Sequence, residues 1–295
     1  MNIVQIYKQF PTEEDCIDHL ERVRWGGKPR CPYCDSDNST PQITKGRRRR
    51  HHCNNCNTSY SVTVGTIFHH THLDLQKWFL AVSLILNAKK GISARQLARD
   101  LEVNKDTAWR ISMKIREAMS QAHHRELLTG LVEMDETYIG GKHRKDGSGG
   151  PPKRGRGTSK TPVVGMVERG GKIKTKVSKK GDLNTKKLSA LVRRHVDIEN
   201  AVLMTDEYGG YMRIKNFMAH EVIQHKVWYV DGFRHTNTIE SFWALLKRGL
   251  VGQFHKVSVK HLPKYLDEFC YRHNYRKHPD LFGMTISRGL GVING

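Results

Sequence analysis

The chain has 295 residues, a formal net charge of +21 and a pI of about 9.8. That length is enough for two or three domains, and the positive charge favours a polyanionic partner, nucleic acid before an anionic membrane surface. The longest apolar run, at 78–88, is shorter than the roughly 20 residues that span a bilayer, and the N-terminus lacks the basic-then-apolar order of a secretory signal. These features argue against a membrane-spanning or secreted protein. We expect a cytoplasmic, nucleoid-associated protein that works on DNA.

Residues 1–28 are predicted to carry a short amphipathic helix over 11–25. Pro11 opens this helix and Thr12 is its expected N-cap. Cys16 lies on the apolar stripe, so it is expected to be a small core residue.

Four cysteines form two Cys-x-x-Cys pairs within residues 29–66. Cys31 and Cys34 are separated from Cys53 and Cys56 by 18 residues, a spacing typical of a zinc ribbon with four thiolate ligands. We predict that these four side chains bind one structural Zn²⁺ ion. The alternative is two unrelated turns with reduced cysteines.

A basic loop, KGRRRRHH at 45–52, joins the two cysteine pairs. We expect it to contact DNA phosphates through its arginines: Arg47, Arg48, Arg49 and Arg50. His51 and His52 are substitute zinc ligands in principle, but four cysteines already complete the site.

Residues 67–128 are predicted to form a helix-turn-helix region that binds DNA. After a first helix that Gly91 ends, one helix is expected over 94–101 and another from Lys105, with Ser93 and Asn104 as N-caps. The residues expected to face DNA are Lys105, Thr107 and Arg110. An ordinary helical bundle is the alternative interpretation.

Residues 129–295 are predicted to form one α/β domain of strands and helices. It contains a basic loop at 141–160 with further expected DNA contacts at Lys153, Arg154 and Arg156. A strand is expected over 225–232, followed by helices. The last of these is a C-terminal helical arm at 258–276, which either braces DNA or a partner subunit, or is a plain amphipathic helix.

Three carboxylates stand out within this domain. Asp135 lies in the middle of an apolar strand, where an unpaired acid costs several kcal/mol to bury. Asp206 directly follows a buried strand, where α/β sheets place their chemistry, and Glu240 lies in the first turn of a helix. Each has an ordinary explanation taken alone; Glu240, for example, fits a capping box with Asn237 as N-cap. Together the three acids are suited to hold two Mg²⁺ ions, which prefer hard oxygen ligands.

The segments MDETYIGGK, TDEYGGY and HTNTIESFWALLKRG resemble, in order, the three catalytic segments of the DDE transposases of bacterial insertion sequences. The most similar branch, the ISXO type, has a zinc ribbon, a helix-turn-helix and a ribonuclease H-like catalytic domain. The resemblance implies Asp135 and Asp206 as metal ligands and Glu240 as the third acid. It also implies that Lys247, seven residues after Glu240, orients DNA near the cut. Asn237, one helical turn before Glu240, is the alternative third ligand.

The function implied is that of a transposase. It is expected to bind the inverted-repeat ends of an insertion sequence, cleave their 3′ ends and join them to target DNA, using two Mg²⁺ or Mn²⁺ ions. Joining two ends requires a homodimer or a higher synaptic assembly. The alternatives are a DNA-binding regulator that does not cut, derived from a transposase, and a structure-specific nuclease.

Overall fold

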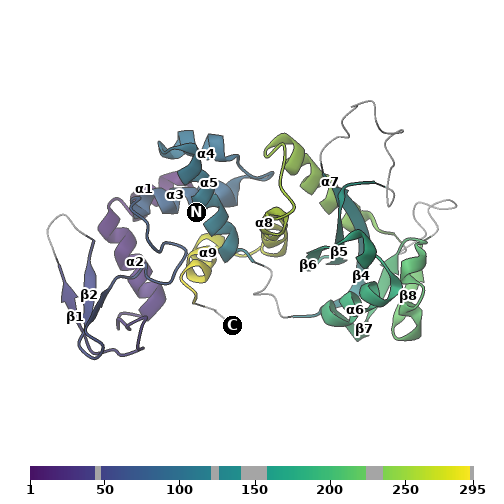
Figure 1. The fold of residues 1–295 in the computed structure, drawn as a ribbon, viewed down its shortest axis with the longest axis horizontal. Helices are drawn as coiled ribbons and strands as arrows, with labels where there is room; N and C mark the ends of the chain where they lie inside the picture. Colours follow the sequence, from purple (N-terminus) through teal and green to yellow (C-terminus); the bar gives the residue numbers. More distant parts are fainter. Residues whose placement is uncertain (44–47, 121–125, 141–157, 224–234, 293–295) are drawn as a thin grey trace. The chain divides into compact units, whose positions relative to one another are not determined.

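The structure, a computed structural model, describes residues 1–43, 48–120, 126–140, 158–223 and 235–292. The chain divides into two compact units, Met1–Ser120 together with His278–Gly295, and Gln121–Lys277. Figure 1 labels most helices and strands of each unit. Within the described ranges, no helix is both long enough and apolar enough to cross a membrane.

The first unit is mainly helical and is built around α3. Its helices are α1 (Ile3–Gln9), α2 (Glu13–Trp25), α3 (Leu75–Asn87), α4 (Ala94–Leu101), α5 (Lys105–Ala118) and α9 (Leu281–Gly289). Helix α3 contacts the other five, and it buries side chains around most of its circumference, as a central helix must. Helix α9 joins this unit because Phe282 packs against Phe10 and Phe79. The sequence instead predicts one domain at 129–295, which would include α9.

Local capping fixes where these helices begin. Thr12 accepts a hydrogen bond from the backbone N–H of Asp15 and caps α2, as the sequence predicts. Ser93 and Asn104 cap α4 and α5 in the same way, so the two helices begin at the residues expected for a helix-turn-helix. The sequence did not predict α1, although Asn2 and Gln5 form its capping box.

A small antiparallel sheet in the same unit carries the cysteines. Its strands are β1 (Ser39–Gln42), β2 (Arg50–Cys53) and β3 (Thr58–Tyr60), in the order β1-β2-β3. Cys53 ends β2, and Cys56 lies in the turn between β2 and β3.

The second unit contains a mixed five-stranded sheet in the order β6-β5-β4-β7-β8. The strands are β4 (Leu128–Ile139), β5 (Thr161–Glu168), β6 (Ile173–Val177), β7 (Val196–Thr205) and β8 (Ala219–Val222). Strand β4 pairs antiparallel with β5 and parallel with β7, and β8 extends the parallel side. The helices are α6 (Thr185–His195), α7 (Asn237–Gly252) and α8 (Leu262–Asn274), and short 3-10 turns lie at Lys180–Asp182, Gly209–Tyr211 and Ile214–Asn216.

Helices cover both faces of the sheet, and β4 supplies each face with alternate side chains. Val132 and Met134 enter a core that includes Leu188 of α6. Glu133 and Asp135 point to the opposite face and bond to side-chain or backbone groups of α7. This layered arrangement confirms the predicted ribonuclease H-like α/β class.

The remaining predicted elements have mixed outcomes. Helix α8 packs against β6 with Leu262, Leu266 and Phe269 buried, as the amphipathic interpretation of the C-terminal arm expects. The strand predicted over 225–232 lies outside the described residues, as does the basic loop up to residue 157. Strand β8 was not predicted.

Candidate functional site

Asp135 and Asp206 lie on neighbouring parallel strands. Asp135 is inside β4, and Asp206 directly follows the end of β7. In the parallel pairing Glu133 lies opposite Met204, so the same register continued by two residues sets Asp206 opposite Asp135. Because side chains alternate along a strand, both aspartates belong to the face of the sheet that α7 covers.

The surroundings of Asp135 disfavour its charged form. Burial first, and then the carboxylates of Glu136 and Asp206, raise the pKa of Asp135 to about 7. Trp243 of α7 donates a hydrogen bond from Nε1 to Asp135 Oδ2 at 3.1 Å and opposes this rise. A divalent cation bound by both aspartates would offset their mutual repulsion and favour the ionised form.

Gly165 makes room for this contact. It is the partner of Asp135 in the β4–β5 pairing, so a side chain there would point to the same face. A Cβ atom at position 165 would lie only 2.5 Å from Trp243 Cζ2 and 3.0 Å from Ile239 Cδ1. The indole of Trp243 therefore occupies the space that any other residue at 165 would fill.

We expect Gly165→Ala to displace α7 from the sheet and to destabilise the protein by about 1–3 kcal/mol, the usual cost of overpacking. Loss of the Trp243–Asp135 hydrogen bond should lower any activity that depends on Asp135. Gly252→Ala, in the same helix but with open space around the added Cβ, is the matched control. Denaturant unfolding followed by tryptophan fluorescence measures the difference, and equal stability of the two variants would contradict the prediction.

Helix α7 carries the remaining predicted catalytic residues. Glu240 lies in its first turn and accepts a hydrogen bond at Oε1 from Thr236 Oγ1 at 2.9 Å. Thr236 is the N-cap position and Asn237 is the first helical residue, which corrects the interpretation of Asn237 as N-cap. Lys247 is exposed further along the same helix.

The structure brings the acids together only in part. Asp206 is close enough to Asp135 to contribute to its raised pKa, whereas Glu240 belongs to the turn of α7 that precedes Trp243. In the described part of the chain, the four cysteines form a cluster that could bind a metal ion, because their sulfur atoms all lie within 4.8 Å of one another. Carboxylate oxygens such as those of Asp135 and Asp206 are the ligands that a hard cation such as Mg²⁺ prefers. Glu240 is the acid that α7 carries, three residues before Trp243.

Glu133 is a buried acid whose role the sequence did not reveal. Its carboxylate is fully buried and accepts hydrogen bonds from the backbone N–H groups of Thr238 and Ile239, both at 2.9 Å. Arg169 forms an ion pair with it at 2.7 Å. Unlike Asp135, this acid is satisfied entirely by protein groups.

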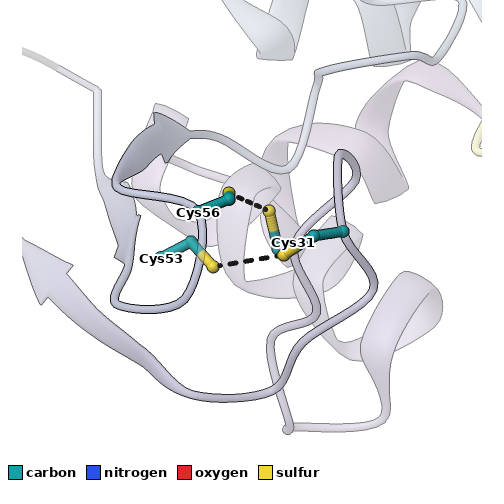
Figure 2. Close-up of side chains that lie close together, drawn as sticks. Cys31, Cys53 and Cys56 are labelled. Carbon is teal, nitrogen blue, oxygen red and sulfur yellow. Dashed lines mark hydrogen bonds between the residues drawn. The ribbon is translucent and has the colours of Figure 1, made fainter.

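The four cysteines form a compact tetrad at the base of the ribbon. The Sγ atoms of Cys31 and Cys56 are 3.6 Å apart, and those of Cys34 and Cys53 are 3.5 Å apart. Tetrahedral Zn²⁺ with bonds of about 2.3 Å separates its sulfur ligands by about 3.8 Å, so the observed spacing fits zinc. Figure 2 shows Cys31, Cys53 and Cys56 turned toward one another.

Backbone groups prepare one of these thiols for metal binding. The N–H of Cys56, and to a smaller extent that of Asn55, lower the pKa of Cys53 to about 6. Because the thiolate is the form that binds a metal ion, these hydrogen bonds favour ligation at neutral pH.

The arginines of the ribbon are engaged within the protein. Arg48 forms an ion pair with Glu13 of α2 at 2.7 Å. Arg49 pairs with three acids of the same helix: Glu14, Asp18 and Glu21. Arg50 donates to a backbone carbonyl of β3, and Arg47 lies outside the described residues. These contacts tie the ribbon to α2, and a DNA contact by the same arginines stays a prediction.

The predicted DNA-facing residues of α5 lie at its N-terminal end. Lys105 and Arg110 are exposed, Thr107 is partly buried, and Lys105 is 3.4 Å from Asp106 in an exposed ion pair. This is the end of a recognition helix that contacts base edges in helix-turn-helix proteins. The expected contacts of the basic loop lie outside the described residues: Lys153, Arg154 and Arg156.

Comparison with known proteins gives matches over most of the chain. A relative described as an uncharacterized protein in the transposable element ISH50 of Halobacterium salinarum is 29% identical over 284 residues, 92% of this chain and 94% of that protein. Among solved structures, the Mos1 strand transfer complex is 16% identical with a TM-score of 0.31, covering 73% of this chain and 75% of that one. The Mos1 transposase paired-end complex with the left transposon end is 17% identical with a TM-score of 0.29, covering 72% and 78%.

Two protein families match separate parts of the chain. Residues 11–59 match the transposase zinc-ribbon domain, and residues 127–274, half of the chain, match the ISXO2-like transposase domain. The second match spans the sheet with Asp135 and Asp206 and the helix with Glu240. The chain therefore belongs to the family of ISXO2-like transposases.

Proposed function

We propose that this protein cleaves the 3′ ends of an insertion sequence and joins them to target DNA. In the first step water attacks the phosphodiester at the end of the element, leaving a 3′-hydroxyl and a 5′-phosphate. In the second step that hydroxyl attacks a phosphodiester of the target, so one bond forms as another breaks. Neither step needs a covalent protein–DNA intermediate.

In this proposal each acid has a defined task. Asp135 and Asp206 bind the cations between β4 and β7, and Glu240 completes the site from α7. Two Mg²⁺ or Mn²⁺ ions bound there would activate the attacking oxygen and stabilise the leaving one. Trp243 orients Asp135 through its hydrogen bond.

The observation that carries the proposal is the pairing of two acids on one face of the sheet. Asp135 and Asp206 follow the parallel register of β4 and β7, and the carboxyl ends of such strands are where α/β folds place their reactive groups. The raised pKa of Asp135 supports it, since the protein by itself leaves this carboxylate unstabilised and a bound cation would favour its ionised form.

We propose that the first unit recognises the ends of the element. The N-terminal end of α5, with Lys105, Thr107 and Arg110, would enter the major groove. Lys247 would bind a phosphate near the cut. Because two ends must be joined, the working form would be a homodimer or a higher assembly on DNA.

The proposal is tested by nicking DNA that carries the sequences flanking this gene, with Mg²⁺ or Mn²⁺. We expect nicks at defined 3′ ends with the wild type and none with Asp206→Asn. Glu207→Gln, which changes the adjacent exposed acid, should nick like the wild type. Tight binding without nicking in all three proteins would refute the proposal and favour a DNA-binding regulator; nicking without joining would favour a nuclease.

A further inference from the structure

The carboxylate of Glu133 caps helix α7 from a distant strand. It accepts hydrogen bonds from the backbone N–H groups of Thr238 and Ile239, which lie 105 and 106 residues later in the chain. Thr238 Oγ1 donates a third bond, to Glu133 Oε1, at 2.9 Å. The N-cap residue, Thr236, makes no side-chain capping bond of its own.

A helix needs such acceptors because the first N–H groups of any α-helix have no partner within the helix. A negative charge at that end also interacts favourably with the helix dipole. Glu133 supplies both from β4, so the start of α7 is fixed to the central strand of the sheet.

A second contact fixes the same helix one turn further on. Trp243 donates to Asp135, two residues after Glu133 on the same face of β4. Glu240 lies between these two anchor points, after Ile239 and before Trp243. Its position relative to Asp135 is therefore set by both.

Glu133 does not compete for the cations that Asp135 and Asp206 are proposed to bind. Its charge is balanced by Arg169, whose Nε lies 2.7 Å from Glu133 Oε1. Arg169 also donates from Nη2 to the backbone carbonyl of His235, in the segment that leads into α7. Glu133 thus binds the first turn of α7, and Arg169 binds the segment just before it. Because their charges cancel, the pair adds no net charge to the site.

We infer that Glu133 is a positioning residue: together with Arg169, it sets the place at which Glu240 meets the metal ions. The inference rests on the proposed function, because it assumes that Glu240 is the third acid. It also predicts a division of labour along one strand, in which Glu133 holds the helix and Asp135 holds the cation.

The test is Mn²⁺ binding to the zinc-loaded full-length protein, followed by electron paramagnetic resonance and compared among three variants. Glu133→Gln keeps the shape of the side chain but removes its charge, and it should weaken Mn²⁺ binding about tenfold, as loss of an outer-shell support typically does. Glu207→Gln removes an equal charge next to Asp206 at an exposed position, where solvent screens it, and should change binding by less than about twofold. Asp206→Asn shows which Mn²⁺ signal belongs to the catalytic site.

Hydrogen exchange supplies a readout of position. In Glu133→Gln the amides of residues 238 and 239 should exchange faster, while DNA-end binding stays at the wild-type level. If this variant does not fold, Thr238→Val decides, since it removes one donor to Glu133 and leaves the ion pair with Arg169 in place. It should also weaken Mn²⁺ binding.

Each outcome separates the two claims. Equal Mn²⁺ affinity in the wild type and in the folded Glu133 variant, or in Thr238→Val when that variant decides, overturns the inference alone. Equal weakening by Glu133→Gln and Glu207→Gln also overturns it, because the effect would then be one of charge and not of position. If the wild type has no Mn²⁺ site that depends on Asp206, the proposed function fails and the inference falls with it.

Discussion

Replacing Asp135 by Asn should abolish nicking and at the same time stabilise the metal-free protein. Loss of a proposed metal ligand should reduce activity by more than about a hundredfold, since even outer-shell changes cost 10–100-fold. The gain in stability follows from the surroundings of Asp135, which raise its pKa to about 7. Asparagine fills the same space and carries no charge to bury.

The sign of the pH effect follows from proton binding. Between pH 4 and pH 7 the unfolded chain releases the Asp135 proton while the folded protein keeps it, so folding stability falls as pH rises through this range. Below pH 4 both states are protonated and the penalty is absent. Above pH 7 it is complete, and a shift of about three pKa units corresponds to about 4 kcal/mol at most. Asp135→Asn should therefore match the wild type at pH 4 and exceed it at pH 8.

Unfolding should be measured in buffer without added divalent metal, and without a strong chelator that would also remove zinc from the ribbon. Hydrogen exchange in β4 reports on the unit that contains Asp135. Glu199→Gln, which neutralises an exposed acid of β7, should leave both the nicking rate and the pH dependence unchanged. A wild type whose stability does not fall between pH 4 and pH 8 relative to Asp135→Asn would contradict the explanation by burial. Added Mn²⁺ should stabilise the wild type and not the variant, because only a ligand that binds the folded state shifts the equilibrium.

Signals that act over a few residues made much of the fold predictable. Ser93 and Asn104 each accept a hydrogen bond from an N–H three residues later, so the sequence alone gave the start of α4 and α5. The two cysteine pairs predicted a tetrad because each turn presents two sulfurs. The strand ahead of Asp206 was recognisable from its unbroken apolar run.

Glu133 and Asp135 show where such signals end. Both acids lie on the same face of one strand. The alternation of side chains along the strand therefore cannot show which of the two forms an ion pair within the protein. The difference comes from Arg169, beyond the end of β5, and from the start of α7 more than a hundred residues later. Contacts at that separation depend on the assembled fold and leave no local pattern.

The arginine run is a similar case. A cluster of cations in a protein with a net charge of +21 favours a DNA contact from composition alone. In the folded chain, however, Arg48 and Arg49 meet the acidic first turns of α2. Acids near the N-terminus of a helix also interact favourably with the helix dipole, so their presence in α2 has a local explanation. The sequence therefore contains alternative partners for the arginines, but it does not show that the arginines and the acids lie close together in the fold.

Removal of zinc should unfold the ribbon. The small sheet has little apolar surface of its own: its core holds Tyr60 with Cys31 and Cys53, and Trp25 and Val64 pack at its margin. Zinc binding contributes about 10–16 kcal/mol in comparable peptides, far more than so small a core. We expect one zinc ion per purified chain, and we expect Cys53→Ser to lose it together with the protection of β2 from hydrogen exchange.

Cys16→Ala is the matched control, because Cys16 is also buried but lies in α2, outside the tetrad. It should keep one zinc ion per chain by elemental mass spectrometry, and β2 should stay protected. Since Arg49 ties the ribbon to α2, loss of zinc should also speed exchange in the side of α2 that bears Asp18 and Glu21. A Cys53→Ser protein that retains both its zinc and the protection of β2 would show that the tetrad is not the metal site. Loss of zinc without loss of that protection would show that the ribbon folds on its ion pairs with α2 and not on the metal.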